Sequence, residues 1–386
     1  MKLLFSTLSD LSGMNGESTH VVELANSLAL LGCEVHLTGI KKSDELSEKV
    51  KWYKLPDTVN KRGLSVLSQI IQKYSSANLI KKIIKKNKIN AVYERYTHLN
   101  AGAVLGKKFG IPVVIELNGA IPVESGTNKI EKKEIEVLKS ADSIVSASRG
   151  IKEFYVAQGI DGKKIHVVFN GVNTSLFKPM EKNGCRKELG INGKPLIVFS
   201  GSFRKYQGLE ELIRAMPIVL KKLPKAKLVI VGGPGKFKGV EFKPAEGDLR
   251  EMTLSLGVSD SIVFAGVVNH TEIPKYVNAS DICICPFEKN RFGAVKIFEY
   301  MACRKPVIAT RIPDLEEFKD CICLMEDNNS KEISESIIGL CKNKGYTEKI
   351  ARNAFEKSGQ ITWKKTAERV LKIIKMCIGG KNNDEH

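Results

Sequence analysis

The sequence of 386 residues lacks any apolar run close to the roughly 20 residues that a membrane-spanning helix needs. It is also poor in proline, with 13 residues, and its hydrophobic fraction of 42% is that of a globular protein. Collagen-like and disordered classes are therefore excluded. The short apolar patch after Lys2 is ended by polar Ser6 and Thr7, which predicts a buried strand instead of a signal peptide. We therefore expect a cytoplasmic protein of two domains, each large enough to bury its own core.

The cysteines do not suit a complete disulfide framework, because their number, nine, is odd. Cys283 and Cys285 are separated by one residue, and so are Cys321 and Cys323. On a strand this spacing puts both thiols of a pair on one face. Zinc sites usually separate paired cysteines by two or more residues and place them on turns. The pattern predicts buried structural thiols and no metal site.

Acidic residues are outnumbered by basic ones, 43 to 61, which gives a net charge of +18. The excess is concentrated between Lys41 and Lys88, where there are 13 Lys or Arg residues and only four acids. Apolar residues recur among these lysines from Leu64 to Ile84, so the stretch is amphipathic and basic. Such a stretch suits the surface of an anionic membrane, and a solvated basic face is an equal alternative. No nucleic-acid-binding motif accompanies the charge, so we expect no nucleic acid partner.

Short apolar segments rich in β-branched residues alternate with longer segments of helical spacing along the chain. In the first half, the strand patterns cover residues 2–6, 34–39, 91–94, 113–116, 143–146 and 166–169. In the second half they cover 196–200, 227–231, 262–265, 282–285, 306–309 and 322–325. Helical patterns stand between them, for example at 21–31, 98–109 and 209–220. The alternation predicts an α/β fold with two parallel, doubly wound sheets, each covered by helices on both faces.

A break between the halves is marked by the turn residues Asn170 and Gly171 and then by Pro179. We predict Rossmann-like domains at residues 1–172 and 173–360, and a polar tail at 379–386. The carboxyl ends of parallel strands carry the binding crevice of such a domain. Two domains of this kind would therefore place their crevices toward a shared cleft.

Two glycine-containing turns each follow a predicted strand and precede a helix. The first ends at Gly16, where the lack of a side chain lets backbone amides approach a phosphate that the helix dipole favours. The second runs from Gly201 to Gly208 and carries Arg204 and Lys205, two cations that can neutralise a diphosphate. The alternatives are an ordinary strand-to-helix turn and a solvated loop that caps a helix.

The segment from Pro286 to Ala302 follows a buried strand and predicts the start of a helix. Within it, Lys296 and Glu299 are three residues apart and share one helix face. Near a helix N-terminus Lys296 can meet phosphate oxygens, and the Glu299 carboxylate can accept hydrogen bonds from both hydroxyls of a ribose. The alternative is a surface ion pair of little energetic value.

Taken in order, these motifs resemble the family-4 glycosyltransferases, which are retaining enzymes with the GT-B fold. The resemblance extends from Met1 to about Lys372. The segments that carry it are residues 15–35, 93–96, 169–179, 201–215 and 296–310, and Lys-Ile-Phe-Glu-Tyr-Met-Ala at 296–302 is the most specific. The resemblance implies two Rossmann-like domains that face a central cleft, an acceptor-binding domain first and a nucleotide-sugar-binding domain second. It also implies a C-terminal helix at 361–378 that packs back on the first domain.

The resemblance further implies roles for particular residues. Gly16 would approach the donor diphosphate from the first domain, and Asn118 takes the cleft position where many members have a histidine. Asn118, Arg204 and Lys296 are the implied catalytic residues, the last two at the phosphates. The implied donor-binding residues are Gly16, Gly201, Ser202, Lys205, Val268 for the base, Ile297, and Glu299 for the ribose.

Three positions depart from the family pattern. Many members have a glutamate eight residues before the ribose-binding one, where this chain has Arg291. Members whose helix begins with Lys-Ile-Phe-Glu share that departure, so it does not predict loss of activity. The phosphate-loop Arg and Lys of the family fall on Ser202 and Gln207, and Asn118 replaces the histidine.

The resemblance implies a retaining glycosyltransferase that moves a sugar from a nucleoside diphosphate sugar, a UDP-sugar or GDP-mannose, to a hydroxyl of a glycan or lipid-linked acceptor. We expect no cofactor and no divalent ion, because no aspartate pair with metal-ligand spacing stands at a strand end. The basic stretch adds an anionic membrane surface as a partner, with the protein peripheral on the inner face. Two alternatives remain open, a catalytically silent partner protein that binds sugar nucleotides and another GT-B enzyme such as a sugar-nucleotide epimerase.

Overall fold

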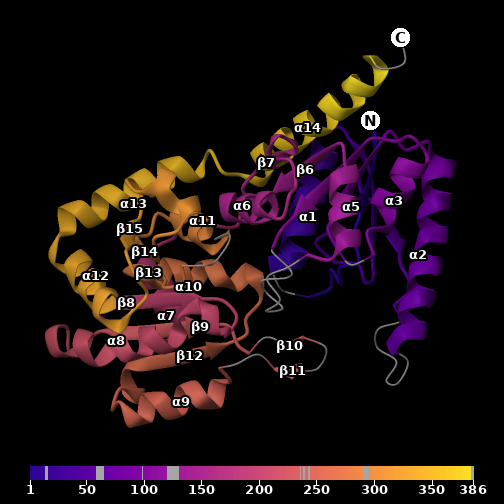
Figure 1. Ribbon diagram of the computed structural model, residues 1–386. Coiled ribbons are helices and arrows are strands. Elements are labelled where there is room, and N and C mark those ends of the chain that lie inside the picture. The colour runs from indigo at the N-terminus through magenta and orange to yellow at the C-terminus, as the bar shows by residue number, and fades with distance from the viewer. Residues whose placement is uncertain are drawn as a thin grey trace. The chain divides into compact units, whose positions relative to one another are not determined.

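A computed structural model describes residues 1–13, 16–57, 65–97, 99–119, 130–234, 236–237, 240–241, 244–289 and 295–383, with the backbone alone at 65–73, 236–237, 240–241 and 381–383. The chain divides into two compact units (Figure 1). Unit 1 combines Met1–Gly171 with the C-terminal segment from Trp363, and unit 2 is Val172–Thr362. The first division lies one residue before the predicted boundary.

Unit 1 is built on a seven-stranded sheet in the order β3-β2-β1-β4-β5-β6-β7, and every neighbouring pair is parallel. Its strands are β1 (Lys2–Ser6), β2 (Glu34–Gly39), β3 (Lys51–Lys54), β4 (Ala91–Arg95), β5 (Val113–Leu117), β6 (Ser143–Ser146) and β7 (Ile165–Val167). Its helices are α1 (Gly16–Leu30), α2 (Ser65–Asn87), α3 (Ala101–Lys108), α5 (Lys132–Ser140), α6 (Arg149–Ala157) and α14 (Trp363–Asn383). Every residue of β5 is buried, which explains why its sequence is apolar at four of five positions instead of alternating.

The C-terminal helix α14 completes the core of unit 1 (Figure 1). Trp363, Val370 and Ile374 of α14 are buried together with Phe5 of β1 and Leu24 of α1. Unit 1 thus takes one of its covering helices from the far end of the chain. The helix continues through residues 379–383, which the sequence assigned to a polar tail.

Unit 2 repeats the plan with a six-stranded parallel sheet in the order β12-β9-β8-β13-β14-β15. Its strands are β8 (Leu196–Ser200), β9 (Lys227–Val231), β12 (Ile262–Gly266), β13 (Ile282–Cys285), β14 (Val307–Thr310) and β15 (Cys323–Met325), and β10 (Lys236–Phe237) pairs with β11 (Val240–Glu241) in a separate antiparallel ribbon. Its helices are α7 (Lys182–Leu189), α8 (Leu209–Lys222), α9 (Glu246–Ser255), α10 (Ile273–Ala279), α11 (Val295–Ala302), α12 (Ser330–Lys342) and α13 (Lys344–Ser358). The predicted α/β fold with two parallel sheets is therefore confirmed.

Several local predictions were wrong for physical reasons. Strand β3 was missed because it lies at the sheet edge, where none of its four side chains is fully buried. The helix predicted at 98–109 begins only at Ala101, since Asn100 has left-handed backbone angles. Cys321 precedes β15, so it does not share a strand face with Cys323 as predicted. The strand predicted at 166–169 is shifted to Ile165–Val167.

The amphipathic part of the basic stretch forms α2, whose side chains are described from Tyr74 onward. Ile80, Ile83 and Ile84 are buried in unit 1. The lysines between and after them, Lys81, Lys82, Lys85 and Lys86, are exposed. The described apolar face of α2 is thus part of the protein core, and its basic face is open to solvent. None of the described helices is both long and apolar enough to cross a membrane.

Candidate donor-binding site

The carboxyl edge of the unit 2 sheet brings two glycine turns together. Gly201 follows β8 and donates its amide hydrogen to the carbonyl oxygen of Val231, at 2.9 Å. A Cβ atom on Gly232 would stand 2.0 Å from the carbonyl oxygen of Gly201, so only glycine permits this approach. The turn after β9 therefore packs directly against the Gly201 loop.

Lys296 lies against the same loop, although it comes from the first turn of α11. Its Nζ donates to the carbonyl oxygen of Ser200 at 2.9 Å and to Oε1 of Gln207 at 2.6 Å. It also stands 4.0 Å from the centroid of the Phe199 ring. These three partners are uncharged, and they orient the ammonium group. The fold therefore joins two sequence features that are about 95 residues apart.

Glu299 is buried, with 8% of its surface exposed, so the alternative of a surface ion pair with Lys296 is wrong. Its Oε1 accepts a hydrogen bond from Nε2 of His270 at 3.0 Å. Ile297 is fully buried, so neither its side chain nor its backbone amide is exposed in this structure. The amides of a first helical turn have no partner within the helix, so their partners come from outside it.

The other predicted site residues of unit 2 lie at the same sheet edge. Arg204 is half-buried, with its guanidinium carbon 5.8 Å from the Tyr206 ring centroid. Ser202 and Val268 are half-buried as well, and Val267 beside Val268 is an apolar side chain with 73% of its surface exposed. Lys205 is exposed, and no hydrogen bond or ion pair within the described structure fixes its ammonium group.

At the carboxyl edge of the unit 1 sheet, Gly16 is the first residue of α1. A Cβ atom there would meet nothing within 4 Å, so the backbone is open to a ligand. The neighbouring turn residues Met14 and Asn15 lie outside the described residues, and so does Arg291 in unit 2. The predicted glycine turn is therefore described only in part.

A buried polar network lies close to this edge of unit 1 and was not predicted. Glu116 at the end of β5 accepts hydrogen bonds from Nε2 of His20, at 2.9 Å, and from the Tyr93 hydroxyl. Nη1 of Arg95 stands 3.7 Å from its Oε2. Burial by itself would raise the pKa of Glu116, but the charges and hydrogen bonds of these partners lower it to about 2. The carboxylate is thus ionised and held in place.

Asn118 lies two residues after Glu116, just beyond the end of β5. Its side-chain oxygen and nitrogen are both buried and have no hydrogen-bond partner within the described structure. A buried amide without partners is costly unless a ligand or water supplies them. This property fits the role that the resemblance implies for Asn118.

Among the described residues, no group of three or more His, Cys, Asp or Glu side chains is arranged to hold a metal ion. The thiols of Cys283 and Cys285 are buried in β13, and burial raises the pKa of each to about 12. Both therefore remain protonated thiols. Their burial agrees with the predicted structural role.

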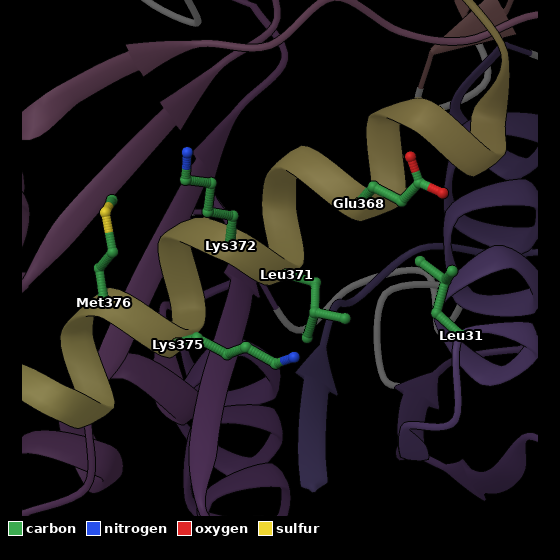
Figure 2. Close-up of a pocket in the computed structure, with 6 residues that line it drawn as sticks. All are labelled: Leu31, Glu368, Leu371, Lys372, Lys375 and Met376. Carbon is green, nitrogen blue, oxygen red and sulfur yellow. The ribbon is translucent and has the colours of Figure 1, made fainter.

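A separate surface hollow lies between α14 and the residue after α1 (Figure 2). The apolar side chains of Leu371 and Leu31 line it together with charged side chains of α14. The lining residues are Leu31, Glu368, Leu371, Lys372, Lys375 and Met376. Leu31 is at the opposite end of α1 from Gly16, roughly 22 Å along the helix axis. The hollow is therefore not part of the candidate site.

Both halves of the chain match known sequence families. The family Glycosyltransferase Family 4 matches residues 14–176, and Glycosyl transferases group 1 matches residues 182–357. A D-inositol 3-phosphate glycosyltransferase of Acidothermus cellulolyticus is 26% identical over 292 residues, which is 71% of this chain. The matched part spans 64% of that relative's length.

Solved structures resemble the fold over nearly the whole chain. The sucrose-phosphate synthase of Thermosynechococcus elongatus has a TM-score of 0.80 and 18% identity, covering 98% of this chain and 99% of that one. Anabaena HepE, solved in complex with UDP and glucose, has a TM-score of 0.78 and 17% identity, covering 97% and 99%. Because the two families together span residues 14–357 with little interruption and the fold agrees, the chain belongs to the family-4 glycosyltransferases with the two-domain GT-B fold, as the sequence resemblance predicts.

Proposed function

We propose that this protein transfers a sugar, with retention of configuration, from a nucleoside diphosphate sugar to a hydroxyl of a glycan or lipid-linked acceptor. The observation that carries the proposal is the position of Lys296, whose ammonium group is oriented by uncharged partners beside the Gly201 loop and the first turn of α11. A fixed cation and the N-terminal turn of a helix at one sheet edge suit a diphosphate. The complex of Anabaena HepE with UDP and glucose gives the same ligand class in a structure of the same fold.

Cleavage of the bond between sugar and diphosphate leaves negative charge on the departing phosphate oxygen. On this proposal, Lys296 and Arg204 meet that charge together with the α11 amides that include Ile297. Their positions are set before the reaction, which is the condition under which such groups lower a barrier most. We expect turnover without a divalent ion, because these cations can supply the charge that a metal would otherwise provide.

The nucleoside would occupy the loops that follow β12 and the buried face of α11. Val267 offers an exposed apolar side chain against which a base can lie, and the backbone at Val268 offers hydrogen bonds to it. Glu299 would accept hydrogen bonds from the ribose hydroxyls, since a carboxylate has several acceptor positions. In unit 1, Gly16 and Asn118 keep the donor-binding and catalytic roles that the resemblance implies.

For the acceptor, we propose a molecule held at an anionic membrane, with the protein peripheral on the cytoplasmic face. The support is the exposed basic face of α2, which carries four lysines within six residues. Each such lysine contributes about 1 kcal/mol to binding an anionic surface. Because Ile80, Ile83 and Ile84 are buried, the described part of α2 would bind through charge and not through insertion of these side chains.

The test is thermal unfolding of the purified protein with UDP, GDP and their sugar derivatives. A ligand at about 100 times its dissociation constant adds about 2.7 kcal/mol to the free energy of unfolding. We expect a raised melting temperature with the nucleotides of one base only. That result identifies the base of the donor. NMR of the transfer product then shows whether configuration is retained, and the transfer rate measured with and without EDTA tests whether a divalent ion is needed.

Other outcomes would contradict the proposal in different ways. If no nucleotide changes the melting temperature, the proposed donor site is contradicted. Binding without transfer to any acceptor in a glycan and glycolipid panel would favour a silent binding partner. Isomerisation of the donor in the absence of acceptor would favour another GT-B enzyme, such as an epimerase.

A further inference from the structure

The buried carboxylate of Glu299 needs a group that orients it if it is to meet a ribose. We propose that His270 is that positioning residue. The inference rests on the proposed function and adds a residue to it. His270 opens a short 3-10 turn (His270–Glu272) after β12, whereas Glu299 is on α11, and neither the spacing nor a motif links them.

The contact between the two side chains is well defined. Nε2 of His270 stands 3.0 Å from Oε1 of Glu299, and the side chains are 17% and 11% exposed. The Phe177 ring packs against the imidazole with its centroid at 5.2 Å and a tilt of 56°. Phe177 is itself almost fully buried. The imidazole is therefore held by packing as well as by its hydrogen bond.

The direction of this hydrogen bond follows from the chemistry of the two groups. An ionised carboxylate carries no hydrogen, so Nε2 of His270 must donate to it. The bond uses one of the roughly four acceptor positions of the carboxylate. Oε2 and the second lone pair of Oε1 remain for the 2′ and 3′ hydroxyls of a ribose.

His270 also limits where the carboxylate can turn. Lys296 and Glu299 are three residues apart on α11, a spacing that brings their side chains within reach of each other. An unrestrained Glu299 could rotate toward the ammonium group, which would occupy both the ribose-binding and the phosphate-binding side chain. Fixing a glutamate in advance also removes an entropic cost from ligand binding.

The experiment compares ribonucleotides with 2′-deoxyribonucleotides, because only the ribose contact distinguishes them. Isothermal titration calorimetry measures UDP, 2′-deoxy-UDP, GDP and 2′-deoxy-GDP against the wild type, His270→Ala and His270→Gln. Glutamine can place an amide nitrogen near the position of Nε2, so it is the conservative variant. His166→Gln is the matched control, since His166 is half-buried in β7 of unit 1. Melting curves of each variant check folding.

We expect the wild type to prefer the ribonucleotide of its base by about 10-fold or more, the value of a hydrogen bond to a charged group. In His270→Ala this preference should fall to about 3-fold or less, while His270→Gln restores it and His166→Gln keeps it. In a transfer assay, His270→Ala should raise the KM for the donor and leave kcat nearly unchanged. A purely structural role for His270 would lower the melting temperature without changing the preference.

The outcomes separate this inference from the proposed function. A wild-type preference that persists in a folded His270→Ala protein overturns the inference and leaves the proposed function intact. A wild type that binds UDP or GDP with no preference for ribose overturns the Glu299 contact and, with it, the role of His270. A wild type that binds none of the nucleotides overturns the proposed function itself.

Discussion

Replacing Lys296 by alanine tests the candidate donor site most directly. Nζ of Lys296 is fixed by the Ser200 carbonyl at 2.9 Å, by Gln207 Oε1 at 2.6 Å and by the Phe199 ring at 4.0 Å. These contacts hold the ammonium group at the sheet edge where we propose that the diphosphate binds. We expect Lys296→Ala to lower kcat by about 10²–10³-fold, the usual effect of removing one preorganised group from a site of developing charge.

The size of this effect agrees with simple electrostatics. Two unit charges 4 Å apart attract by about 4 kcal/mol at the effective dielectric constant of about 20 that suits pairs near a protein surface. A loss of 10²–10³ in rate corresponds to about 2.7–4 kcal/mol. The substitution also removes the donor from the buried Ser200 carbonyl, so some stability is lost as well, about 1.5–3 kcal/mol. Rate and stability must therefore be measured separately.

The assay is transfer from the nucleotide sugar that the thermal screen identifies, with kcat and KM determined for each variant. Lys296→Gln keeps a hydrogen-bond donor for Ser200 without the charge. Its kcat should therefore fall as far as that of Lys296→Ala, while less stability is lost. Lys342→Ala, at the exposed end of α12, is the matched control and should behave as wild type. Turnover of folded Lys296→Ala within threefold of wild type would refute the reasoning.

Four further results are expected. Arg204→Ala should lower kcat by about 10²–10³-fold, by the same argument. Gly208→Ala should destabilise unit 2 by about 3 kcal/mol or more, because φ is +69° and the new Cβ would stand 1.8 Å from the Pro286 carbonyl oxygen. Glu94→Gln should flatten the pH dependence of stability. Burial raises the Glu94 pKa to about 8, although hydrogen bonds from Ser6 and the Ala103 amide act to lower it. The folded chain therefore keeps a proton on Glu94 that the unfolded chain releases above about pH 4.5. The free energy of unfolding therefore falls by about 1.4 kcal/mol per pH unit between about pH 5 and 8 in the wild type, relative to the variant. Replacing the basic face of α2 by glutamine should abolish sedimentation with anionic vesicles at about 0.05 M salt. The residues to change are Lys81, Lys82, Lys85 and Lys86.

The last three of these results each have a control or a contradicting outcome. Urea unfolding of Gly257→Ala, where φ is +66° with nothing within 4 Å, should show a loss of only about 1 kcal/mol, and an equal loss in Gly208→Ala would contradict the steric argument. Parallel stability curves of wild type and Glu94→Gln from pH 5 to 8 would rule out a raised Glu94 pKa. For the vesicles, the control replaces four exposed lysines of unit 2 by glutamine, and this change should not affect sedimentation. These are Lys331, Lys342, Lys344 and Lys349.

The sheet architecture could be predicted because buried parallel strands leave a clear local pattern. The first four residues of β8, from Leu196 to Phe199, are all apolar, since both faces of the strand are covered by helices. Strand β3 carries no such pattern, because an edge strand is only partly covered. Element ends were also predicted less well, and the left-handed Asn100 shows why, since one residue's backbone angles moved a helix start by three positions.

The candidate site could be predicted only in part. Lys296 and Glu299 were found because a helix relates residues three apart, and Gly201 because a turn after a strand shows in the sequence. Gln207 and His270 were missed, because they meet Lys296 and Glu299 across 89 and 29 residues of chain. A histidine or a glutamine alone in a loop gives no signal of such a contact.

The sequence by itself determined the two α/β halves, the family, the basic stretch and the residue types at the sheet edges, because periodicity and turn chemistry depend on neighbours in the chain. Tertiary structure decided the rest. It buried Glu299 against His270, set Lys296 between Ser200 and Gln207, and turned the isoleucines of α2 into the core while leaving the lysines exposed. Burial, charge and orientation depend on which distant segments pack together, and no local pattern contains that information.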